Sequence, residues 1–485
     1  MTSPAIHRVP SLSVRLDGSD LSSAEIVGCR VSQTSGRPDQ IELTFGDAAP
    51  RAAKPQADLE VRLDSQGLLF AGTITAVGHT LGADGAAFVR IRGYDRLQTL
   101  RASTAVRSWQ GVTLHDIAGR FAERLGVTVR PAQGAEIDRV SIQHIIQRGQ
   151  SDLEFLAMLA ARHGLGFRLV ESQLQFYPTD RGTGVPIELR WGEGLREAVV
   201  DDNLEVAARP VHVGSQDLAR VTSHTARTDS GSGPVRNLLG IAELTPFDAD
   251  LLARAEAARW AAAATRAFGV ADGDLRLRPG AIVNVRGPGL PDRSVVLTRA
   301  EHVLDDLTGF TTRFDSEPIE PPAPASGTAT ASLGTVSTVD EGGTGRVKVT
   351  LDAYDGIETA LLPVITAAAG IGGLVALPEV GSRVIVLSDT LDLSQGVVLG
   401  GVFPDRLPDA ARASGRTHGS VWTTPAGQRI EMDDHDRVLV LTDTSGSRLE
   451  FAPGVVRLHA SGDLELGAPG HGVRITASSV DFVRG

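Results

Sequence analysis

The sequence predicts a mainly β protein built from several small domains, and three observations support this. The chain has 485 residues, which at roughly 100–200 residues per domain accommodates three or four domains. Short β-branched runs alternate with turn residues, and glycine occurs 54 times, as is typical of all-β architectures. The third observation is a repeat of apolar pairs in residues 419–485, which predicts a repetitive β tail.

The composition excludes several classes of function. Acidic residues outnumber lysine plus arginine by 59 to 47, so the net charge is −12, and an acidic surface repels phosphate backbones. We therefore expect no nucleic-acid partner. No run of about 18 apolar residues occurs, and residues 1–16 lack an apolar signal segment, so we expect neither a transmembrane segment nor a signal peptide. The single Cys29 excludes an intrachain disulfide.

Residues 1–100 predict a first small β-barrel. Its segments alternate apolar and polar residues with the period of two expected of half-buried strands. Turn residues such as Asp17 and Gly18 separate them. The alternating segments are 11–16, 41–45, 68–77 and 87–91.

Residues 101–210 predict an α/β insert. Thr113 can cap a helix whose apolar residues recur at helical spacing until Gly126 ends it. A second helix begins at a capping box, in which Ser151 accepts from the third amide and Glu154 bonds back to the cap.

The rest of the chain before the tail predicts two more β domains separated by a linker. Residues 211–317 predict a second small barrel around one helix. Residues 318–331 are rich in proline, serine and glycine and predict a linker. Residues 332–404 contain about five short strands, which fits an OB-fold barrel, and 405–418 form a second linker.

The tail carries seven pairs of apolar residues two positions apart, with polar or charged residues between or beside them, and the starts of the pairs lie 7 to 11 residues apart. The pairs are too sparse for one chain to enclose a core. Several copies wound about one axis would bury a continuous apolar stripe, so the pattern favours an obligate oligomer, most simply an intertwined trimeric β-helix or β-prism needle. A curled meander packed on the preceding barrel is the alternative. The predicted trimer core consists of Ile430, Met432, Val438, Val440, Leu449, Phe451, Val456, Leu458, Leu464, Leu466, Val473 and Ile475.

Motifs for catalysis or metal binding are weak. The segment Asp-Asp-His-Asp at 433–436 has the composition of a metal site, but it lies at a turn between repeat strands, so we favour a solvated turn. The glycines at 370–373 precede a strand, whereas a phosphate cradle needs a helix N-terminus. The nucleophile elbow, the Walker motif and the zincin motif do not occur. We therefore expect no catalytic residue, cofactor or metal.

Several stretches, in this order along the chain, carry a family resemblance. They are Ser-Asp-Leu-Glu-Phe-Leu at 151–156 with Gly-Leu-Gly-Phe at 164–167, Leu-Arg-Pro-Gly at 277–280, Gly-Arg-Val-Lys-Val at 345–349, and Leu-Pro-Glu-Val-Gly-Ser-Arg-Val at 377–384 with Gly-Gly-Val at 400–402. Together with the order of domains, they resemble the VgrG-type hub and spike proteins of contractile injection systems, which include phage tails and type VI secretion. The resemblance covers nearly the whole chain.

The resemblance implies a structural protein and not an enzyme. It implies a homotrimeric central spike that joins an inner tube to a membrane-piercing tip, with hub barrels in a pseudo-sixfold ring. Its implied partners are the inner tube hexamer protein, baseplate wedge proteins and, transiently, a target membrane. The implied place of assembly is the cytoplasm, in a tail-like particle that stays there or is released. Only about 15 residues separate the OB domain from the tail, too few for the lysozyme domain of some phage spikes.

The resemblance also implies a separate tip protein. The chain lacks a His-x-His iron tip near its C-terminus, so a PAAR-type tip protein would bind the blunt end of the needle. The residues expected to bind it are Val480, Asp481, Phe482, Val483, Arg484 and Gly485.

A β-solenoid that binds or hydrolyses glycans is the alternative function. Such sites need solvent-facing aromatic platforms and converging carboxylates. The tail has only Trp422, Phe451 and Phe482 as aromatic residues, and two of them belong to the apolar pairs, which counts against this alternative.

Overall fold

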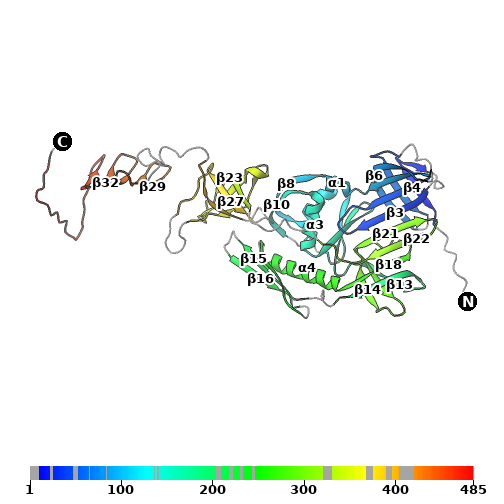
Figure 1. Cartoon of the computed structure of the whole chain (residues 1–485). Helices are drawn as coiled ribbons and strands as arrows, with labels where there is room; N and C mark the ends of the chain where they lie inside the picture. The colour runs from blue at the N-terminus through cyan, green and yellow to red at the C-terminus, as the bar shows by residue number, and fades with distance from the viewer. Residues whose placement is uncertain are drawn as a thin grey trace, which may run out of the picture. The chain divides into compact units, whose positions relative to one another are not determined.

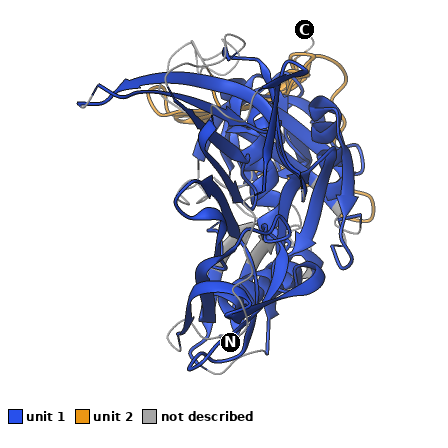
Figure 2. Cartoon of the chain, turned by 90° about the vertical axis from the view of Figure 1, so that its right-hand side faces the viewer, with its two compact units in different colours: residues 1–401 blue, residues 402–485 orange. Residues whose placement is uncertain are grey.

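The chain divides into two compact units, residues 1–401 and 402–485 (Figures 1 and 2). Strands predominate in a computed structural model, which confirms the predicted mainly β fold. No helix in the described part of the chain is long and apolar enough to cross a membrane. The structure describes residues 10–21, 26–46, 53–64, 66–83, 85–135, 137–138, 141–203, 209–217, 222–229, 233–242, 246–320, 330–366, 375–388, 396–403 and 420–483.

Fourteen strands of the first unit form one continuous sheet, made of two halves. The first half contains β1 (Leu12–Leu16), β2 (Ser19–Leu21), β3 (Ile26–Thr34), β4 (Gln40–Phe45), β5 (Asp58–Leu63), β6 (Gly67–Leu81) and β7 (Ala87–Tyr94). The second half contains β13 (Thr183–Trp191), β14 (Gly194–Asp202), β18 (Thr265–Asp272), β19 (Ala281–Arg286), β20 (Arg293–Val296), β21 (Arg299–Asp305) and β22 (Gly309–Asp315). The order is β2-β1-β5-β6-β7-β4-β3-β21-β22-β18-β14-β13-β19-β20, so the halves join where β3 pairs antiparallel with β21.

Each half of this sheet has its own hydrophobic core. In β1, Leu12, Val14 and Leu16 are buried while the residues between them are exposed, as the predicted period of two requires. In the second half, Val283 and Val285 of β19 belong to a separate buried cluster. Among the described residues no pairing closes either half on itself, so closure into two barrels stays a prediction.

The insert contains both predicted helices. Thr113 caps α2 by accepting from the amide of Asp116, and Gly126 ends it in the left-handed conformation (φ 65°). Ser151 and Glu154 form the predicted capping box of α3. The elements are α1 (Gln98–Ala102), β8 (Thr104–Thr113), α2 (Leu114–Leu125), β9 (Thr128–Pro131), β10 (Ser141–Ser151), α3 (Asp152–Arg162), β11 (Leu165–Val170) and β12 (Gln173–Pro178).

The structure differs from the predicted division into residues 101–210 and 211–317. Strands β13 and β14, predicted to be in the insert, belong to the second half of the large sheet. Strands β15, β16 and β17 and helix α4 were predicted to be in the second barrel. The three strands instead form a separate sheet, order β16-β15-β17, and α4 packs on it through Ala249, Ala253 and Ala257. Sheet membership depends on pairing with distant strands, which local alternation does not encode. The bounds are β15 (Val211–Asp217), β16 (Thr222–Arg227), β17 (Arg236–Ala242) and α4 (Pro246–Ala264).

The OB domain is a six-stranded β unit around a valine-rich core. Its sheet order is β25-β24-β23-β27-β28, with β26 also paired to β24. A parallel bridge from Val364 to Val398 of β28 brings the β26 end of the sheet to the opposite edge. The elements are β23 (Thr330–Val339), β24 (Arg346–Leu351), the 3-10 turn η3 (Asp352–Tyr354), β25 (Ile357–Glu358), β26 (Leu362–Pro363), β27 (Arg383–Ser388) and β28 (Gly396–Gly401).

The second unit contains an antiparallel five-stranded meander. Its strands are β29 (Ser420–Thr423), β30 (Arg429–Asp433), β31 (Val438–Thr442), β32 (Arg448–Ala452) and β33 (Val455–His459). Four of the seven predicted repeat strands are present. The prediction is wrong for the last three in the single chain, since residues 460–483 contain no strand. A strand needs hydrogen-bonding partners, and one chain does not provide them here.

Candidate assembly site

The tail sheet has one apolar face and one charged face, because its register fixes which residues share a side. Ile430 pairs with Leu441 across β30 and β31, and Leu441 pairs with Leu449 across β31 and β32. Every second residue along these strands continues the same face. The apolar face consists of Trp422, Ile430, Met432, Leu439, Leu441, Leu449, Phe451, Val456 and Leu458.

The register places two of the predicted core residues on the face opposite to the others, and the predicted trimer core stays a prediction. Val440 pairs with Glu431 and Glu450, and Val438 pairs with Asp433, so both valines lie on the charged face. Leu439 and Leu441 occupy the apolar face instead. Residues 438–441 are Val-Leu-Val-Leu, so the odd-numbered and the even-numbered residues of this strand are equally apolar. Alternation alone therefore could not predict which set lies on the apolar face of the sheet.

The charged face is neutralised by ion pairs within the chain. Glu431 lies 3.1 Å from the guanidinium of Arg429. Glu450 lies between Arg448 at 3.1 Å and Arg457 at 2.5 Å. Such surface pairs contribute about 0–1 kcal/mol each to stability. Because the charges are already paired within the chain, this face can remain in solvent without a binding partner.

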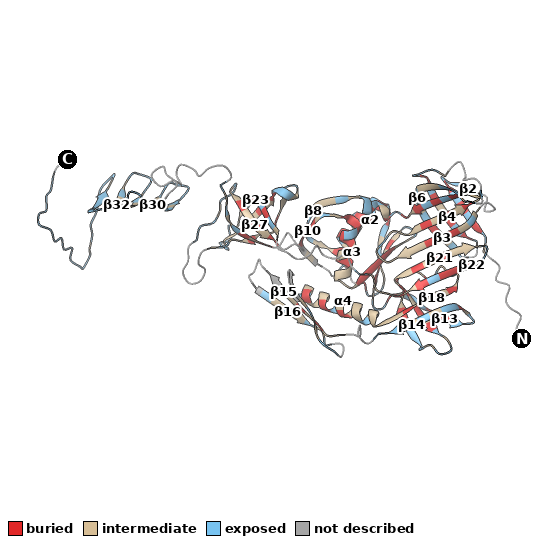
Figure 3. Cartoon of the chain, in the orientation of Figure 1, coloured by how far each residue is buried: buried red, intermediate tan, exposed pale blue. Residues whose placement is uncertain are grey.

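Most residues of the apolar face are exposed in the single chain, and Figure 3 colours the tail strands mostly as exposed or intermediate. Phe451 is 42% exposed and Leu458 is 57% exposed. Within residues 420–483 the only buried side chain is that of Asp433. Its Oδ1 accepts hydrogen bonds from the amides of His435 and Asp436, which is the role of an aspartate in a turn.

The 433–436 segment therefore has a structural role in the turn. Among the described residues, no cluster of three or more His, Cys, Asp or Glu side chains could hold a metal ion.

The remaining predicted core residues, and the tip residues that the structure describes, lie outside any strand. Leu464, Leu466, Val473 and Ile475 are all more than half exposed. At the tip, Val480 and Asp481 are exposed, and Phe482 is 94% and Val483 88% exposed. Arg484 and Gly485 lie outside the described residues.

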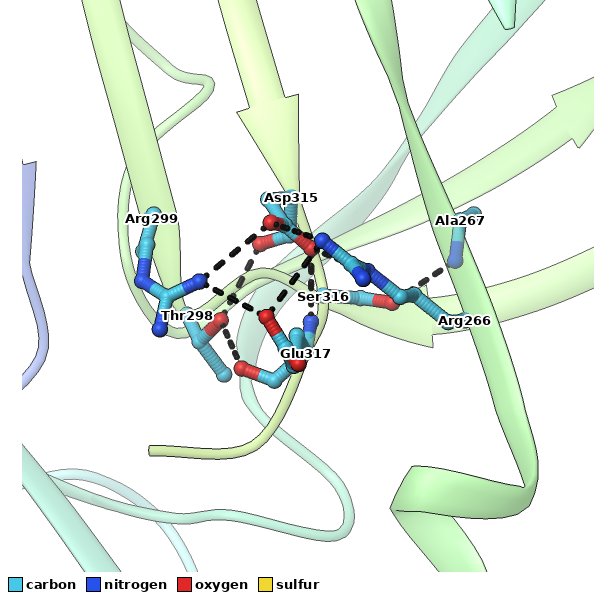
Figure 4. Close-up of polar contacts among 7 residues, drawn as sticks. All are labelled: Arg266, Ala267, Thr298, Arg299, Asp315, Ser316 and Glu317. Atoms are coloured by element: carbon cyan, nitrogen blue, oxygen red, sulfur yellow. Dashed lines mark hydrogen bonds and ion pairs between the residues drawn. The ribbon is translucent and has the colours of Figure 1, made fainter. Parts of the chain in front are cut away.

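The point where the chain leaves the hub sheet is held by a cluster of ion pairs (Figure 4). At the end of β22, Asp315 accepts two hydrogen bonds from Arg266 of β18, at 3.0 and 2.8 Å. Arg299 of β21 lies 3.0 Å from Glu317, the second residue after the strand. The Arg266 guanidinium is the main group that lowers the pKa of Asp315, against the effect of its partial burial. The cluster joins three neighbouring strands at the start of the predicted linker.

A two-stranded ribbon of the insert contacts the OB domain. Strands β8 and β10 pair along most of their length, and Ile146 of β10 is buried in the OB core with Val347 and Val349. Beside it, the ring of His144 lies 2.7 Å from the hydroxyl of Ser108. Burial, reinforced by the charge of Lys348, lowers the pKa of His144 to about 4, so this histidine is neutral at pH 7.

Sequence reasoning missed this ribbon and the β3–β21 junction. The ribbon had a local signal, since three isoleucines, Ile142, Ile145 and Ile146, lie within five residues shortly before the capping box at Ser151. The junction had none, because it joins strands more than 260 residues apart, as in the hydrogen bond from Ser32 to Glu301.

Comparisons with known families agree with this architecture. The model described as phage tail baseplate hub (GPD) matches residues 36–308. The model described as type VI secretion system/phage-baseplate injector OB domain matches residues 332–403. No curated protein matches the chain.

Solved structures share the fold at low sequence identity. The tail protein from Neisseria meningitidis MC58 is 16% identical with a TM-score of 0.52, over 64% of this chain and 96% of that chain. The E. coli c3393 protein, a type VI secretion component similar to the T4 bacteriophage tail proteins gp27 and gp5, is 14% identical with a TM-score of 0.54, over 81% and 99%. A chain of the Francisella PdpA–VgrG complex in its lidded form is 9% identical with a TM-score of 0.54, over 94% and 81%.

The hub model alone covers more than half of the 485 residues, and the OB model follows it in the order that the sequence resemblance predicts. The chain therefore belongs to the phage tail baseplate hub (GPD) family and contains an injector OB domain after the hub region.

Proposed function

We propose that three copies of this chain form the central hub and spike of a contractile, phage tail-like baseplate, which joins the inner tube to a membrane-piercing tip. The observation that carries this proposal is the exposed apolar face of the tail sheet, which lies opposite a face of paired charges. A single chain leaves that face in water.

Three tails wound on one axis would turn their apolar faces inward and their charged faces outward. Fully burying one large apolar side chain contributes about 1.5–3 kcal/mol, so the stripe as a whole would strongly favour assembly. Partner strands would also supply hydrogen bonds to the apolar pairs of residues 464–482. A needle closed in this way has no open strand edges and resists deformation.

The hub sheet supports the same stoichiometry. Each chain contributes two seven-stranded halves joined by the β3–β21 pairing, so three chains would contribute six halves. Six similar units in a ring would match a hexameric inner tube, and baseplate wedge proteins would bind around the ring. A PAAR-type tip protein would bind residues 480–485, and the spike would meet the target membrane only transiently.

The proposed role needs rigidity and not catalysis, and the particle would assemble in the cytoplasm. The glycan-binding alternative would use aromatic platforms in the tail. Trp422 and Phe451 instead share the apolar face, where they pair with Ile430 and Leu439.

The molar mass of the purified full chain in dilute buffer tests the proposal. Multi-angle light scattering is expected to give about three times 50.9 kDa. A monomer that persists at all concentrations would overturn the trimeric spike. Binding of that monomer to peptidoglycan fragments would then establish the glycan alternative.

A further inference from the structure

A cavity of about 600 Å³ lies between helices α3 and α4 of the hub region. The chain after α3 approaches α4 closely at one point, where an added Cβ at Gly164 would lie 3.4 Å from the Cα and Cβ atoms of Ala255. Around that point, several of the residues that line the cavity from the two helices are alanines, including Ala157 and Ala161 of α3 and Ala262 of α4. Their short side chains leave the space between the helices unfilled.

Each helix packs on its own sheet or core with a different set of residues. Leu156 of α3 is fully buried in the insert core, whereas Ala157 and Ala161 remain partly exposed. Ala253 of α4 packs on the three-stranded sheet, whereas Ala262 lines the cavity. Protein interiors are normally packed with few voids larger than a water molecule. A volume of this size instead falls in the range of ligand pockets, which is roughly 300–1,000 Å³.

The wall of the cavity is mainly apolar. Leu165, Phe167 and Leu297 contribute to it and are at most 8% exposed. Met158, Leu252 and Ile319 add further apolar surface. A cavity that holds ordered water needs several polar partners for each molecule, so this wall favours the apolar body of a ligand.

Polar groups in the wall already have partners within the chain. The hydroxyl of Thr179 donates to the carbonyl of Gly164 at 2.9 Å. The hydroxyl of Thr298 donates to the carbonyl of Glu317 at 2.6 Å. These threonines therefore have little capacity left to bind a ligand with many polar groups.

The charges of the wall favour an anion. Glu154 is used in the capping box of α3, and Glu256 pairs with Arg259 at 2.8 Å. Arg37 and Arg101, which we call the rim arginines, are exposed and form no ion pair with any described residue. The charged side chains that line the cavity, within the described part of the chain, are Arg37, Arg101, Arg162, Arg259, Glu154, Glu256 and Glu320.

The rim arginines thus place two unpaired positive charges beside an apolar cavity, against the one exposed carboxylate of Glu320, in a chain whose net charge is −12. A guanidinium binds a carboxylate through two parallel hydrogen bonds, which makes arginine suited to such a head group.

We propose that this cavity binds a long-chain carboxylate, with the apolar chain between α3 and α4 and the carboxylate at the rim arginines. The inference goes beyond the proposed spike function. It concerns the hub region of each chain and does not depend on the proposed trimer.

Calorimetric titration of the full chain with octanoate, decanoate and decanol tests the proposal. Each additional buried methylene should raise the affinity about fourfold, so decanoate is expected to bind about fifteenfold more tightly than octanoate. Decanol, which has the same chain and no charge, is expected to bind at least fivefold more weakly than decanoate. Failure of decanoate to bind, or equal affinities for decanoate and decanol, would overturn the proposal.

Adjacent residues of α4 test the location. Ala262→Phe fills part of the cavity and is expected to weaken decanoate binding at least tenfold. Ala261→Phe makes the same change at an exposed residue outside the wall, so it should alter the affinity less than twofold. Equal affinities for the two variants would place the ligand elsewhere.

Removal of the rim charges tests the head group without changing the apolar wall. The double variant R37Q/R101Q is expected to bind decanoate at least tenfold more weakly and decanol unchanged. The control R30Q/R92Q removes two exposed arginines outside the cavity and should leave both affinities within twofold. An unchanged decanoate affinity in R37Q/R101Q, or an equal loss for both ligands, would contradict the role of the rim arginines.

Discussion

The hub sheet and the tail sheet are built from the same alternating pattern, yet only one of them buries its apolar face. In β1, Val14 and Leu16 are each 1% exposed because other strands of the same chain cover them. In the tail, Met432 remains 39% exposed on an equally apolar face. Alternation thus determines which residues share a face, and the number of packed layers in the chain determines whether that face is covered. Among the described residues, no second layer covers the apolar face of the tail sheet.

Substitutions on adjacent residues of β31 should show this difference most strongly. Leu441→Lys puts a charge on the apolar face and is expected to convert the trimer to monomer, since unpaired buried charges are very costly. Val440→Lys puts the same charge between Glu431 and Glu450 on the other face and should leave the trimer intact. Light scattering distinguishes the two, and dissociation by V440K but not L441K would reverse the assignment of the faces.

The C-terminal pairs form a second test of the tail. Leu464→Asp is expected to weaken the trimer at least tenfold in half-dissociation concentration, because three carboxylates would be buried together. The neighbouring substitution Glu465→Gln removes a charge at a residue outside the predicted apolar pairs and should have little effect. An unchanged dissociation curve for L464D would mean that residues 460–483 do not join the needle.

Substitutions in the core of the hub region should have the opposite effect. They should lower the folding stability of the chain and leave the mass of the assembly unchanged. Phe155 is fully buried and stacks on Trp109 with ring centroids 6.3 Å apart. Phe155→Ala is expected to cost about 3–5 kcal/mol of folding stability in urea titrations. Val185→Ala, at a position 86% exposed, should cost less than about 0.5 kcal/mol. Loss of the trimer in F155A below its unfolding range would contradict the independence of the two regions.

A smaller and more local effect is expected at the contact between the ribbon and the OB domain. Ile146→Ala should cost about 2–5 kcal/mol and accelerate hydrogen exchange in β24, because Ile146 packs in the OB core. Ile142→Ala, four residues earlier, should accelerate exchange in the insert instead, since Ile142 packs against the insert core. Identical exchange patterns for the two variants would show that the ribbon does not hold the OB domain.

The smallest expected effect is a pH dependence at the same contact. His144 has a folded pKa of about 4 against an ordinary value of 6.5, so between these values the unfolded chain binds a proton that the folded chain does not. Its contribution to stability is complete above pH 6.5 and is lost as the pH falls towards 4. Urea midpoints at pH 7.0 and 4.5 should differ more for the wild type than for His144→Gln, and equal differences would contradict this prediction.

Local signals in the sequence predicted local structure accurately. The caps at Thr113 and Ser151 depend on residues three positions apart, and both helices begin where these caps predict. The OB domain was predictable because its strands are close in sequence and its family motifs lie on them.

The pairing of distant strands, and the face on which some apolar residues lie, were not predictable in this way. The joining of the hub halves depends on β3 and β21, whose pairing has no local signature. In the tail, the apolar pairs were recognised. Around Val438 and Val440, however, consecutive residues are all apolar, so only the register with β30 shows on which face of the sheet each residue lies. After His459 the apolar pairs continue in the sequence, but residues 460–483 contain no strand, because alternation alone does not supply the hydrogen-bonding neighbours that a strand needs.

The ion-pair cluster after β22 has a mechanical consequence. A pull on the chain beyond Glu317 acts along β22, which lies between β18 and β21, so both ladders are loaded in shear and their hydrogen bonds resist together. Arg266 of β18 and Arg299 of β21 form ion pairs with the end of β22 and with Glu317 just after it. The force is therefore shared by three strands before the hydrogen bonds of any one ladder can break in sequence. The ion pairs thus strengthen the attachment of the segment beyond Glu317 to the hub sheet.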